Sequence, residues 1–274
     1  MLTTPPPPLF RSSDIVTVAR NRLLGALAPD DFDLLAPHFV ETVLEPGSVL
    51  HQSGQAIKRV YFPLSGLVSL VATLPERHAI DTVAIGREGA VGLSAAIGSQ
   101  IAWNRAVVQL SGRALQMSAG RLADLADRSK PLRAMIARYN DILTAQIQQT
   151  VACNTLHPIQ ARLGRWLLQA RDRTGSDTLA VTQEFLSGAL GVQRTTITLV
   201  SRILQSEGIL HVRRGHIQIR DASALERKTC DCYRVARRLA EQIGREPAWP
   251  IAAQSLRAAI PADQSKRPGA ALPD

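Results

Sequence analysis

Hydrogen-bonding side chains gather in one short segment, LSGALGVQRTTITLVS, which covers residues 186–201. Its apolar residues recur at helical spacing, although Thr195, Thr196 and Thr198 are poor helix formers because β-branching restricts their rotamers. Arginine donates bidentately to guanine, hydroxyl groups donate or accept, and the threonine methyl group can contact thymine. These residue types therefore predict a helix whose outward face reads base edges in the DNA major groove.

Two short helices joined by a glycine turn would position these side chains. Thr182 stands where a helix cap belongs, and TQEFLSGAL follows with apolar residues at helical spacing. Gly191 permits the left-handed turn that a short linker between two crossed helices needs. Gln193 is predicted to cap the second helix, RTTITLVSRILQSEG, and Gly208 to end it. The predicted buried stripe of this second helix comprises Ile197, Val200, Ile203 and Leu204.

A basic hairpin follows the second helix. The segment ILHVRRGHIQI places Arg213, Arg214 and His216 at its tip, where cations would lie along a phosphate backbone. A generic helical hairpin is the alternative for the two helices alone, and the basic wing argues against it. The candidate DNA-contacting residues are Thr182, Gln193, Arg194, Thr195, Thr196, Thr198, Ser201, Arg202, Arg213, Arg214 and His216.

Short β-branched or alternating runs occupy residues 39–117. FVETVLEPGSVLHQSG, RVYFPLSGLVSLVATL, AIDTVAIGREGAVG and RAVVQLSGRALQM are separated by turn signals such as Pro46-Gly47 and Ser111-Gly112. This near-regular spacing predicts a small antiparallel barrel or jelly roll. Ahead of the strands, apolar spacing predicts short helices over 14–27 and 29–37.

A long helix is predicted after the strands, within PLRAMIARYNDILTAQIQQTVA. Its apolar residues form a narrow seam of the kind that pairs with a twin helix. Packing of this face on the chain's own barrel is the alternative. A break at Leu156-His157-Pro158 precedes another helix, IQARLGRWLLQARDRTG, which Gly175 closes. The residues predicted at a dimer interface are Leu132, Met135, Ile136, Tyr139, Ile142, Leu143 and Ile147.

Composition and charge narrow the class of protein. The chain has 274 residues, of which 45% are hydrophobic and 20% charged, as in soluble globular proteins of one large or two modest domains. Of the formal net charge of +9, residues 151–274 carry +7. This excess of positive charge favours a polyanionic partner, with nucleic acid favoured over an anionic membrane. No apolar run approaches the ~18 residues of a spanning helix, and the amino terminus lacks the order of a secretory signal. Three cysteines cannot all pair, which favours a reducing cytoplasm.

Residues from about 20 to 235 resemble the Crp/Fnr family of bacterial transcription regulators. The matching segments are TQEFLSGALGVQRTTI in the predicted DNA-reading helices, EPGSVLHQSG and VYFPLSGLVSL in the barrel, and GREGAVGL in the region of the barrel that binds the effector in this family. HPIQARLGRWLL and CDCY resemble a subgroup common among alphaproteobacterial members. The resemblance implies an α+β fold: an antiparallel β jelly roll of the cyclic-nucleotide-binding type, a long dimerisation helix and a carboxyl-terminal winged helix-turn-helix. It also implies a cytoplasmic homodimer on pseudo-palindromic double-stranded DNA, with RNA polymerase as a partner and no membrane contact.

The expected domain order follows from these segments. A disordered tail covers 1–13, the jelly-roll sensor domain 14–126, the dimerisation helix 127–153, the winged helix-turn-helix 154–236, and a largely disordered tail 237–274. By analogy with the family, Arg194 would contact a base. The family often has an acidic residue where Thr195 stands and a basic one where Leu199 stands, so the operator should differ from the best-known one.

The effector pocket of the barrel departs from the pattern of relatives that bind cyclic AMP. The resemblance places Gly92, Leu93, Ser94, Asn104 and Arg105 at this pocket. Leu93 stands where those relatives hold the ribose with a glutamate, and Asn104 stands where an arginine neutralises the cyclic phosphate. Because a one-residue shift in a strand reverses the side-chain direction, Arg105 is expected outside the pocket. We therefore expect no bound cofactor and no cyclic AMP in the usual mode, and either an unknown effector or a filled barrel.

Metal and redox chemistry find little support in the sequence. An iron–sulfur cluster needs four thiolates, and the chain has only Cys153, Cys230 and Cys232. Cys230 and Cys232 could form a redox pair or a partial metal site, but a structural role is favoured. The histidines, His157 among them, show no metal-binding spacing such as HxH, so we expect no metal site.

The sequence predicts a transcription regulator and not an enzyme. Two other functions agree less well with the sequence. A cupin-type barrel enzyme with an accessory DNA-binding tail would need converging His, Glu or Asp ligands from the strands, which the sequence lacks. A cyclic-nucleotide-responsive module without DNA reading would not need the basic wing or the polar recognition helix.

Overall fold

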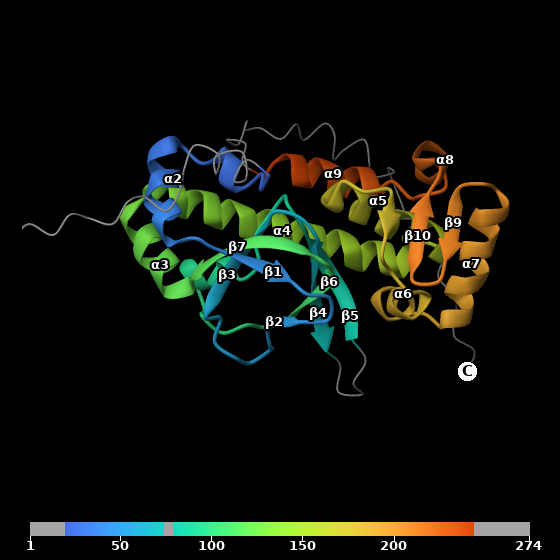
Figure 1. Ribbon diagram of the computed structural model, residues 1–274, viewed down its shortest axis with the longest axis horizontal. Coiled ribbons are helices and arrows are strands. Elements are labelled where there is room, and N and C mark those ends of the chain that lie inside the picture. Colours follow the sequence, from blue (N-terminus) through green and yellow to red (C-terminus); the bar gives the residue numbers. More distant parts are fainter. Residues whose placement is uncertain (1–19, 74–78, 244–274) are drawn as a thin grey trace, which may run out of the picture. The chain divides into compact units, whose positions relative to one another are not determined.

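The amino-terminal part of the protein is built from two antiparallel β-sheets (Figure 1). A computed structural model describes residues 20–73 and 79–243. The sheets have the strand orders β1-β7-β3 and β2-β6-β4-β5. The strands are β1 (Val40–Leu44), β2 (Val49–His51), β3 (Arg59–Pro63), β4 (Leu67–Thr73), β5 (Ala79–Ile85), β6 (Arg105–Leu110) and β7 (Gly112–Ser118). All pairings are antiparallel, which confirms the fold class predicted for residues 39–117.

Apolar side chains fill the space between the sheets. Alternate residues of β6 are buried, and Ala106 and Val108 are fully covered. The strand β4 is covered on both faces, since Val68 joins the barrel core whereas Leu67 packs with the apolar core of the carboxyl-terminal part. This strand therefore belongs to two cores at once, and its near-continuous apolar sequence, LVSLVAT, reflects this.

Short helical segments precede β1. Of the helix expected over 14–27, residues 14–19 lie outside the described residues, and residues 20–27 form only a 3-10 turn, η1 (Leu24–Ala26), whereas α2 (Pro29–Leu35) and η2 (Ala36–His38) match the second prediction. The buried side chain of Asn21 anchors this turn, because it bonds to segments far away in sequence. Its Nδ2 donates to the carbonyl oxygens of Pro63 and Gly89, both at 2.9 Å.

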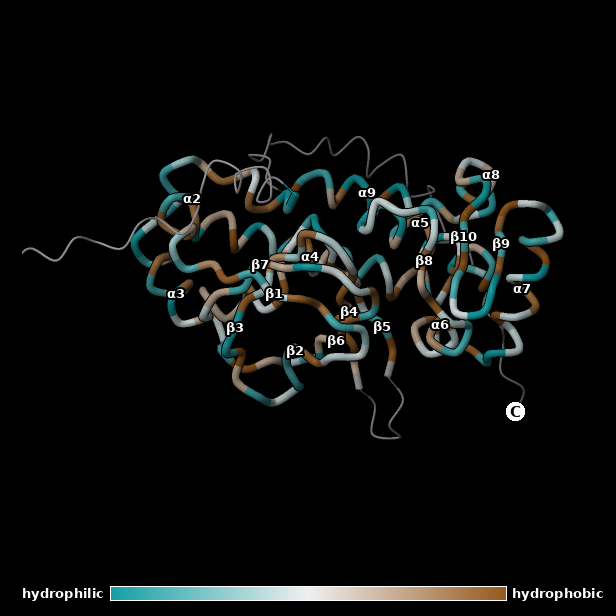
Figure 2. Tube along the Cα trace, viewed as in Figure 1, coloured by the Kyte–Doolittle hydropathy of each residue, from teal (hydrophilic) through white to brown (hydrophobic). Residues whose placement is uncertain are grey.

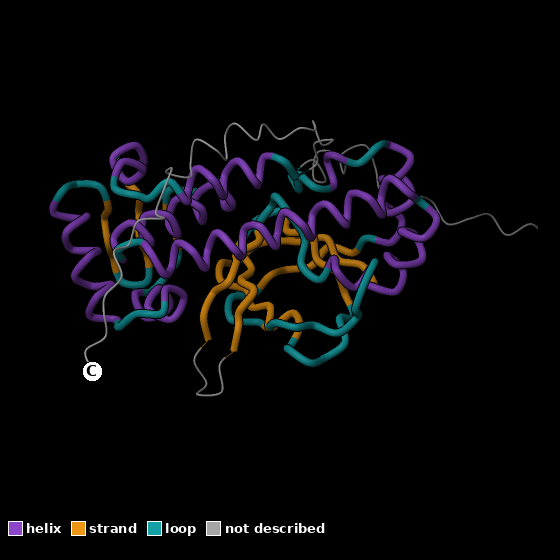
Figure 3. The backbone as a smooth tube through the Cα atoms, turned by 180° about the vertical axis from the view of Figure 1, so that it is seen from behind, coloured by secondary structure: helices purple, strands orange, loops and turns teal. Residues whose placement is uncertain are grey.

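Two helices follow the strands, α3 (Ala119–Arg128) and the 27-residue α4 (Lys130–Leu156). The hydroxyl groups of Ser118 and Ser129 cap them by accepting hydrogen bonds from backbone amides of their first turns. In the view from behind in Figure 3, α4 is the long helix that crosses in front of the strands, and it contacts β5.

The apolar seam of α4 is covered by the chain's own barrel, which corrects the predicted dimer interface. Of its seven residues, Leu132, Met135, Ile136, Tyr139 and Ile142 are buried, while Leu143 and Ile147 are partly buried and pack against the barrel cores. Tyr139 shows how closely the helix fits. Its hydroxyl group donates to the carbonyl oxygen of Ala90 at 2.8 Å. A Cβ at Gly89 would lie 2.4 Å from the hydroxyl oxygen of Tyr139. Glycine is therefore required beneath the ring.

The carboxyl-terminal part combines helices with a three-stranded antiparallel sheet of order β8-β10-β9. Its elements are α5 (Ile159–Thr174), β8 (Thr178–Leu179), α6 (Gln183–Leu190), α7 (Arg194–Ser206), β9 (Leu210–Arg213), β10 (His216–Ile219), α8 (Ala222–Arg227) and α9 (Cys232–Glu241). Gly175 closes α5 with φ 70°, as predicted. The core of this part includes Leu167, Leu186 and Ile197. The helix α9, part of which is coloured as hydrophilic in Figure 2, is amphipathic, and its inner face buries Cys232, Tyr233 and Ala236.

The helix α9 continues to Glu241, so the predicted tail does not begin at residue 237. The expected tail over 1–13, and the rest of the one over 237–274 from residue 244 onward, lie outside the described residues. Among residues 20–73 and 79–243, no helix combines the length and apolar character needed to cross a membrane.

A buried ion pair joins the two parts of the chain. Nε of Arg173 on α5 donates to Oε1 of Glu88 at 2.7 Å, and the side chains are 8% and 7% exposed. The carboxylate also accepts a hydrogen bond from the amide of Gly86, directly after β5. This contact fastens α5 to the loop that leaves the barrel.

Candidate functional site

The helix pair α6 and α7 has the local structure that the sequence predicts. Oγ1 of Thr182 caps α6 by accepting a hydrogen bond from the amide of Phe185 at 3.0 Å. Gly191 ends α6 with φ 64°, a left-handed conformation that disfavours other residues, and α7 then begins at Arg194. Gln193 occupies the N-cap position of α7 but its side chain makes no capping hydrogen bond, which corrects that prediction.

One face of α7 packs on the core and the other is left exposed at its amino-terminal end. Ile197, Val200 and Leu204 are buried as predicted, whereas Ile203 is 40% exposed and does not belong to the buried stripe. Of the predicted base-contacting residues of this helix, the exposed ones are Gln193, Arg194, Thr195 and Arg202, and the half-buried ones are Thr196 and Thr198.

Ser201 is buried, and this corrects its predicted contact with DNA. Its side chain is turned inward with 1% exposure, since its position falls beside Val200 and Leu204 on the inner face. Sequence spacing alone placed it one turn after Thr198, and the boundary between the two faces decides its direction. By contrast, Leu199 is 61% exposed, so an apolar side chain lies on the outer face among the polar ones.

Neighbouring side chains from α6 orient the start of α7. Oγ1 of Thr198 lies 2.7 Å from Oε1 of Gln183 and 3.0 Å from the carbonyl oxygen of Arg194. The guanidinium of Arg194 lies 3.8 Å from the carboxylate of Glu184, and both side chains are largely exposed. An exposed pair of this kind contributes about 0–1 kcal/mol, so Arg194 can exchange it for another acceptor. Gln183 and Glu184 were not among the predicted site residues; their place in the first turn of α6 is the only signal in the sequence.

The hairpin of β9 and β10 forms the predicted wing. Arg213 pairs with His216 across it, and Gly215 turns the tip with φ 75°. Arg213, Arg214 and His216 are all exposed. An open groove of about 520 Å³ lies between the wing and the start of α6 and α7, and its lining includes Thr182, Glu184, Arg194, Arg213 and Arg214. Three guanidinium groups against one carboxylate make this groove attractive to a polyanion.

A second cavity, of about 270 Å³, lies in the barrel against α4. Four of the five predicted effector residues line it, namely Gly92, Leu93, Ser94 and Asn104, whereas Arg105 does not. Nε2 of His51 lies 3.2 Å from Oδ1 of Asn104, and burial lowers the pKa of His51 despite this hydrogen bond. Among the described residues that line the cavity, none is Lys, Arg, Asp or Glu.

The structure also brings together side chains that the sequence keeps far apart. Cys153 and His157 at the end of α4 meet Cys230 and Cys232 at the start of α9. The sequence pointed to no metal site, because the two pairs are more than seventy residues apart and neither has a familiar metal-binding spacing.

The helix-turn-helix segment matches a family model, and most of the chain resembles solved regulators in fold. Residues 161–228 match the model of the Crp-like helix-turn-helix domain. A putative transcriptional regulator of the Crp/Fnr family from Eubacterium rectale is 20% identical with a TM-score of 0.56, over 76% of this chain and 98% of that chain. A Crp-family transcriptional regulator from Thermus thermophilus is 19% identical with a TM-score of 0.57, over 68% and 95% of the two chains. No curated protein matches the sequence.

A third solved structure shares the fold and has a described effector. It is the c-di-GMP-responsive global regulator from Xanthomonas campestris, 16% identical with a TM-score of 0.56, over 71% of this chain and 100% of that chain. These likenesses confirm the fold class of a cyclic-nucleotide-binding-like domain followed by a helix-turn-helix.

Proposed function

We propose that this chain, whose residues 161–228 form a Crp-like helix-turn-helix domain, is a homodimeric transcription regulator that reads a specific DNA sequence through α7. The observation that carries the proposal is the outward face of α7, where Gln193, Arg194 and Thr195 are exposed beside a groove rich in arginine. Residues at the amino-terminal end of a recognition helix are the ones that reach base edges in the major groove. The wing then supplies Arg213 and Arg214 to the phosphate backbone.

Base reading and backbone binding make different predictions for single variants. With a binding site selected from random DNA and fluorescence anisotropy, Arg194→Ala should cost about 1–3 kcal/mol and relax preference at one base position. Arg214→Ala should weaken specific and non-specific DNA alike and lower the slope of log affinity against log salt by about 1. Arg121→Ala, an exposed arginine on α3, serves as the control and should change neither quantity. Equal loss on all sequences for Arg194→Ala would contradict base reading by this residue.

The exposed face of α4 supports the homodimer. With the predicted seam buried in the chain's own core, the opposite face remains uncovered, and its exposed residues recur every three or four positions. They are Ala134, Ala137, Asp141, Thr144, Gln148, Val151 and Thr155. Val151 is 60% exposed, and the small side chains of Ala134 and Ala137 on the same face permit close approach of a second α4. A second copy related by a two-fold axis would place two α7 helices in successive major grooves.

Sedimentation tests this face directly. The double variant Thr144→Arg/Val151→Glu should shift the chain from dimer to monomer and abolish binding to a palindromic site. Asp124→Arg, on the exposed surface of α3, is the matched control and should leave the dimer intact. A dimer that survives the double variant would place the interface elsewhere on the chain.

The barrel cavity supports the proposal that cyclic AMP does not bind in the usual mode. A cyclic phosphate needs a cation or several donors, and the described lining offers only neutral groups, with Leu93 in the place of a ribose acceptor. Calorimetric titration with cyclic AMP should therefore show no binding to the cavity. Binding that disappears in Asn104→Leu and persists in Arg105→Leu would overturn this part of the proposal.

A further inference from the structure

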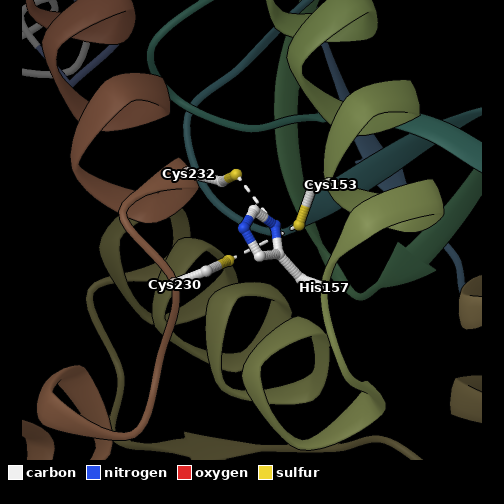
Figure 4. A group of neighbouring side chains, drawn as sticks. All are labelled: Cys153, His157, Cys230 and Cys232. Carbon is white, nitrogen blue, oxygen red and sulfur yellow. Dashed lines mark hydrogen bonds between the residues drawn. The ribbon is translucent and has the colours of Figure 1, made fainter. Parts of the chain in front are cut away.

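Four side chains with metal-binding atoms converge where the two ends of the DNA-binding domain meet (Figure 4). Cys153 belongs to the last turn of α4, and His157 is the residue that ends this helix. Cys230 lies just ahead of α9, and Cys232 is the first residue of α9. The three Sγ atoms and one imidazole nitrogen all lie within 4.8 Å of one another. In Figure 4 the imidazole ring lies among the three sulfurs.

We propose that Cys153, His157, Cys230 and Cys232 bind one zinc ion in a closed, structural Cys3His site. Zinc in structural sites takes four ligands in a tetrahedron, and three cysteines with one histidine are a common set. The proposal concerns a site other than the DNA interface and stands whether or not the chain regulates transcription.

The separations between these ligand atoms fit a tetrahedral zinc ion. Zn–S bonds of about 2.3 Å and Zn–N bonds of about 2.0–2.1 Å place two sulfurs about 3.8 Å apart and a sulfur and a nitrogen about 3.5 Å apart. Sγ of Cys153 lies 3.5 Å from Sγ of Cys230, and Sγ of Cys232 lies 3.5 Å from Nδ1 of His157. The longest separation, 4.8 Å, needs to shorten by only about 1 Å on binding. A cluster of several iron atoms would spread its ligands over different metals and so hold them farther apart.

Local structure presets both ligand pairs. Cys153 and His157 are four residues apart at the end of a helix, where the amide of His157 donates to the carbonyl oxygen of Cys153 at 3.1 Å. Cys230 and Cys232 have a single residue between them, fewer than in most zinc-binding cysteine pairs. The chain turns directly ahead of α9, and this turn directs both sulfurs toward Cys153 and His157. Cys153 and Cys232 are 0% and 4% exposed, while His157 and Cys230 are half-buried, so the four ligand atoms lie largely within the protein.

The surroundings suit the negative charge that such a site carries. Three thiolates and a neutral imidazole around Zn²⁺ have a net charge of −1, and Nε2 of Gln149 donates to Sγ of Cys232 at 3.1 Å. Arg165 is 4% exposed, and its hydrogen-bond partners among the described residues, Thr150, Asn154 and Gln169, are all neutral. A buried guanidinium without an anion is costly. An anionic metal site beside it removes that cost.

The position of the site gives it a definite mechanical role. Cys153 and His157 precede the helix-turn-helix domain of residues 161–228, and Cys230 and Cys232 follow it. One ion would therefore join both ends of that domain to the end of α4. Zinc binding would close a long loop of chain, and closure of this kind stabilises the folded state by restricting the unfolded one.

Metal analysis of the full-length chain tests the proposal. Protein purified under reducing conditions and incubated with Zn²⁺ should retain one zinc per chain by elemental mass spectrometry. With Co²⁺ alone, it should show the intense visible bands of a tetrahedral ion and thiolate-to-cobalt charge-transfer absorption. Cys230→Ser and His157→Ala should lose both signals, whereas His157→Cys restores four ligands and should keep them. His216→Ala, an exposed histidine of the wing, should keep one equivalent.

The outcomes separate zinc from its alternatives. The cobalt spectrum of the unaltered chain does not depend on the folding of any variant, so its absence at one equivalent would overturn the proposal. Zinc retained equally by Cys230→Ser would also overturn it. So would iron with inorganic sulfide in the purified chain, or a disulfide between Cys153 and Cys230 that excludes Zn²⁺ under the same reducing conditions. Because every readout is metal content, failure of DNA binding would leave the result unaffected.

Discussion

The buried pair between Glu88 and Arg173 should contribute far more to stability than a surface pair of similar length. Its side chains are 7% and 8% exposed and 2.7 Å apart. Lys228 and Glu207 form a pair of 2.9 Å whose side chains are 43% and 36% exposed, so the two pairs differ mainly in burial. We expect removal of one partner to have large consequences only for the first pair.

The magnitude follows from what each variant leaves behind. Arg173→Met leaves the Glu88 carboxylate buried, and among the described residues the amide of Gly86 is then its remaining donor. Breaking a buried pair in this way costs about 3–5 kcal/mol of unfolding free energy. The double variant Glu88→Leu/Arg173→Met leaves no buried charge, and its cost should fall to about 1–2 kcal/mol. Glu207→Gln should cost about 0–1 kcal/mol, because solvent screens an exposed pair.

Urea unfolding of these three variants, of the single variant Glu88→Leu and of the unaltered chain provides the assay. Tryptophan fluorescence reports on the carboxyl-terminal core through Trp166, and far-ultraviolet circular dichroism reports on the whole chain. Coincident transitions would license a two-state free energy, and separated ones would show that the pair joins parts that unfold independently. The coupling energy of the double-mutant cycle is the quantity of interest.

Two results would refute the reasoning. If Arg173→Met cost no more than Glu207→Gln, burial would not govern the strength of the pair. If the double variant cost as much as the sum of the single ones, the loss would come from packing and not from an isolated charge.

Three further predictions concern a carboxyl group, a hydroxyl group and a glycine. Burial raises the pKa of Asp81 to about 6, so the folded state binds the carboxyl proton more tightly than the unfolded state does. The unfolding free energy should therefore fall by roughly 2 kcal/mol as pH rises from about 4 to about 7. Asp81→Asn should remove this part of the pH dependence of Tm. Tyr139→Phe should lower the unfolding free energy by about 1–3 kcal/mol, because it leaves the amide and carbonyl of buried Ala90 without their partner; urea unfolding measures it. Gly191→Ala should lower the unfolding free energy by about 1–2 kcal/mol and weaken DNA binding, because φ is 64° at this residue. The cost would come from the backbone and not from a clash, since the nearest atom to the added Cβ is 3.7 Å away. An unchanged Tm would contradict the left-handed turn.

Local signals in the sequence were sufficient for the helix-turn-helix and its wing. Thr182 caps α6, Gly191 turns the chain and Gly215 turns the hairpin, and each depends on residues within a few positions. The same holds for the strands of the barrel, whose turns and alternation are local. The direction of Ser201 was not predictable in this way, because a residue at the edge of a buried stripe is assigned by the shape of the neighbouring core.

Features that depend on distant residues could not be predicted. The apolar stripe of α4 is equally suited to a twin helix and to the chain's own barrel, and only the position of the strands decides between them. The cysteine and histidine ligands have no spacing that suggests a single site, since a folded domain separates the two pairs. The buried state of Arg165 is likewise invisible in a sequence where arginine is normally exposed.

The helix α5 is the element through which the barrel can influence α7. Glu88 lies between Ile85 and Ala90 in sequence, and both of these residues line the barrel cavity. A ligand that bound the cavity more tightly in one conformation of this loop would change the position of Glu88, and with it the end of α5 that Arg173 occupies. About two turns before Arg173, the middle of α5 carries Arg165, beside the proposed zinc site. If the ion pair transmits an effector signal, Glu88→Leu/Arg173→Met should retain zinc and DNA binding but lose the effect of any cavity ligand on DNA affinity. Retained coupling in that variant would assign the signal to α4 instead.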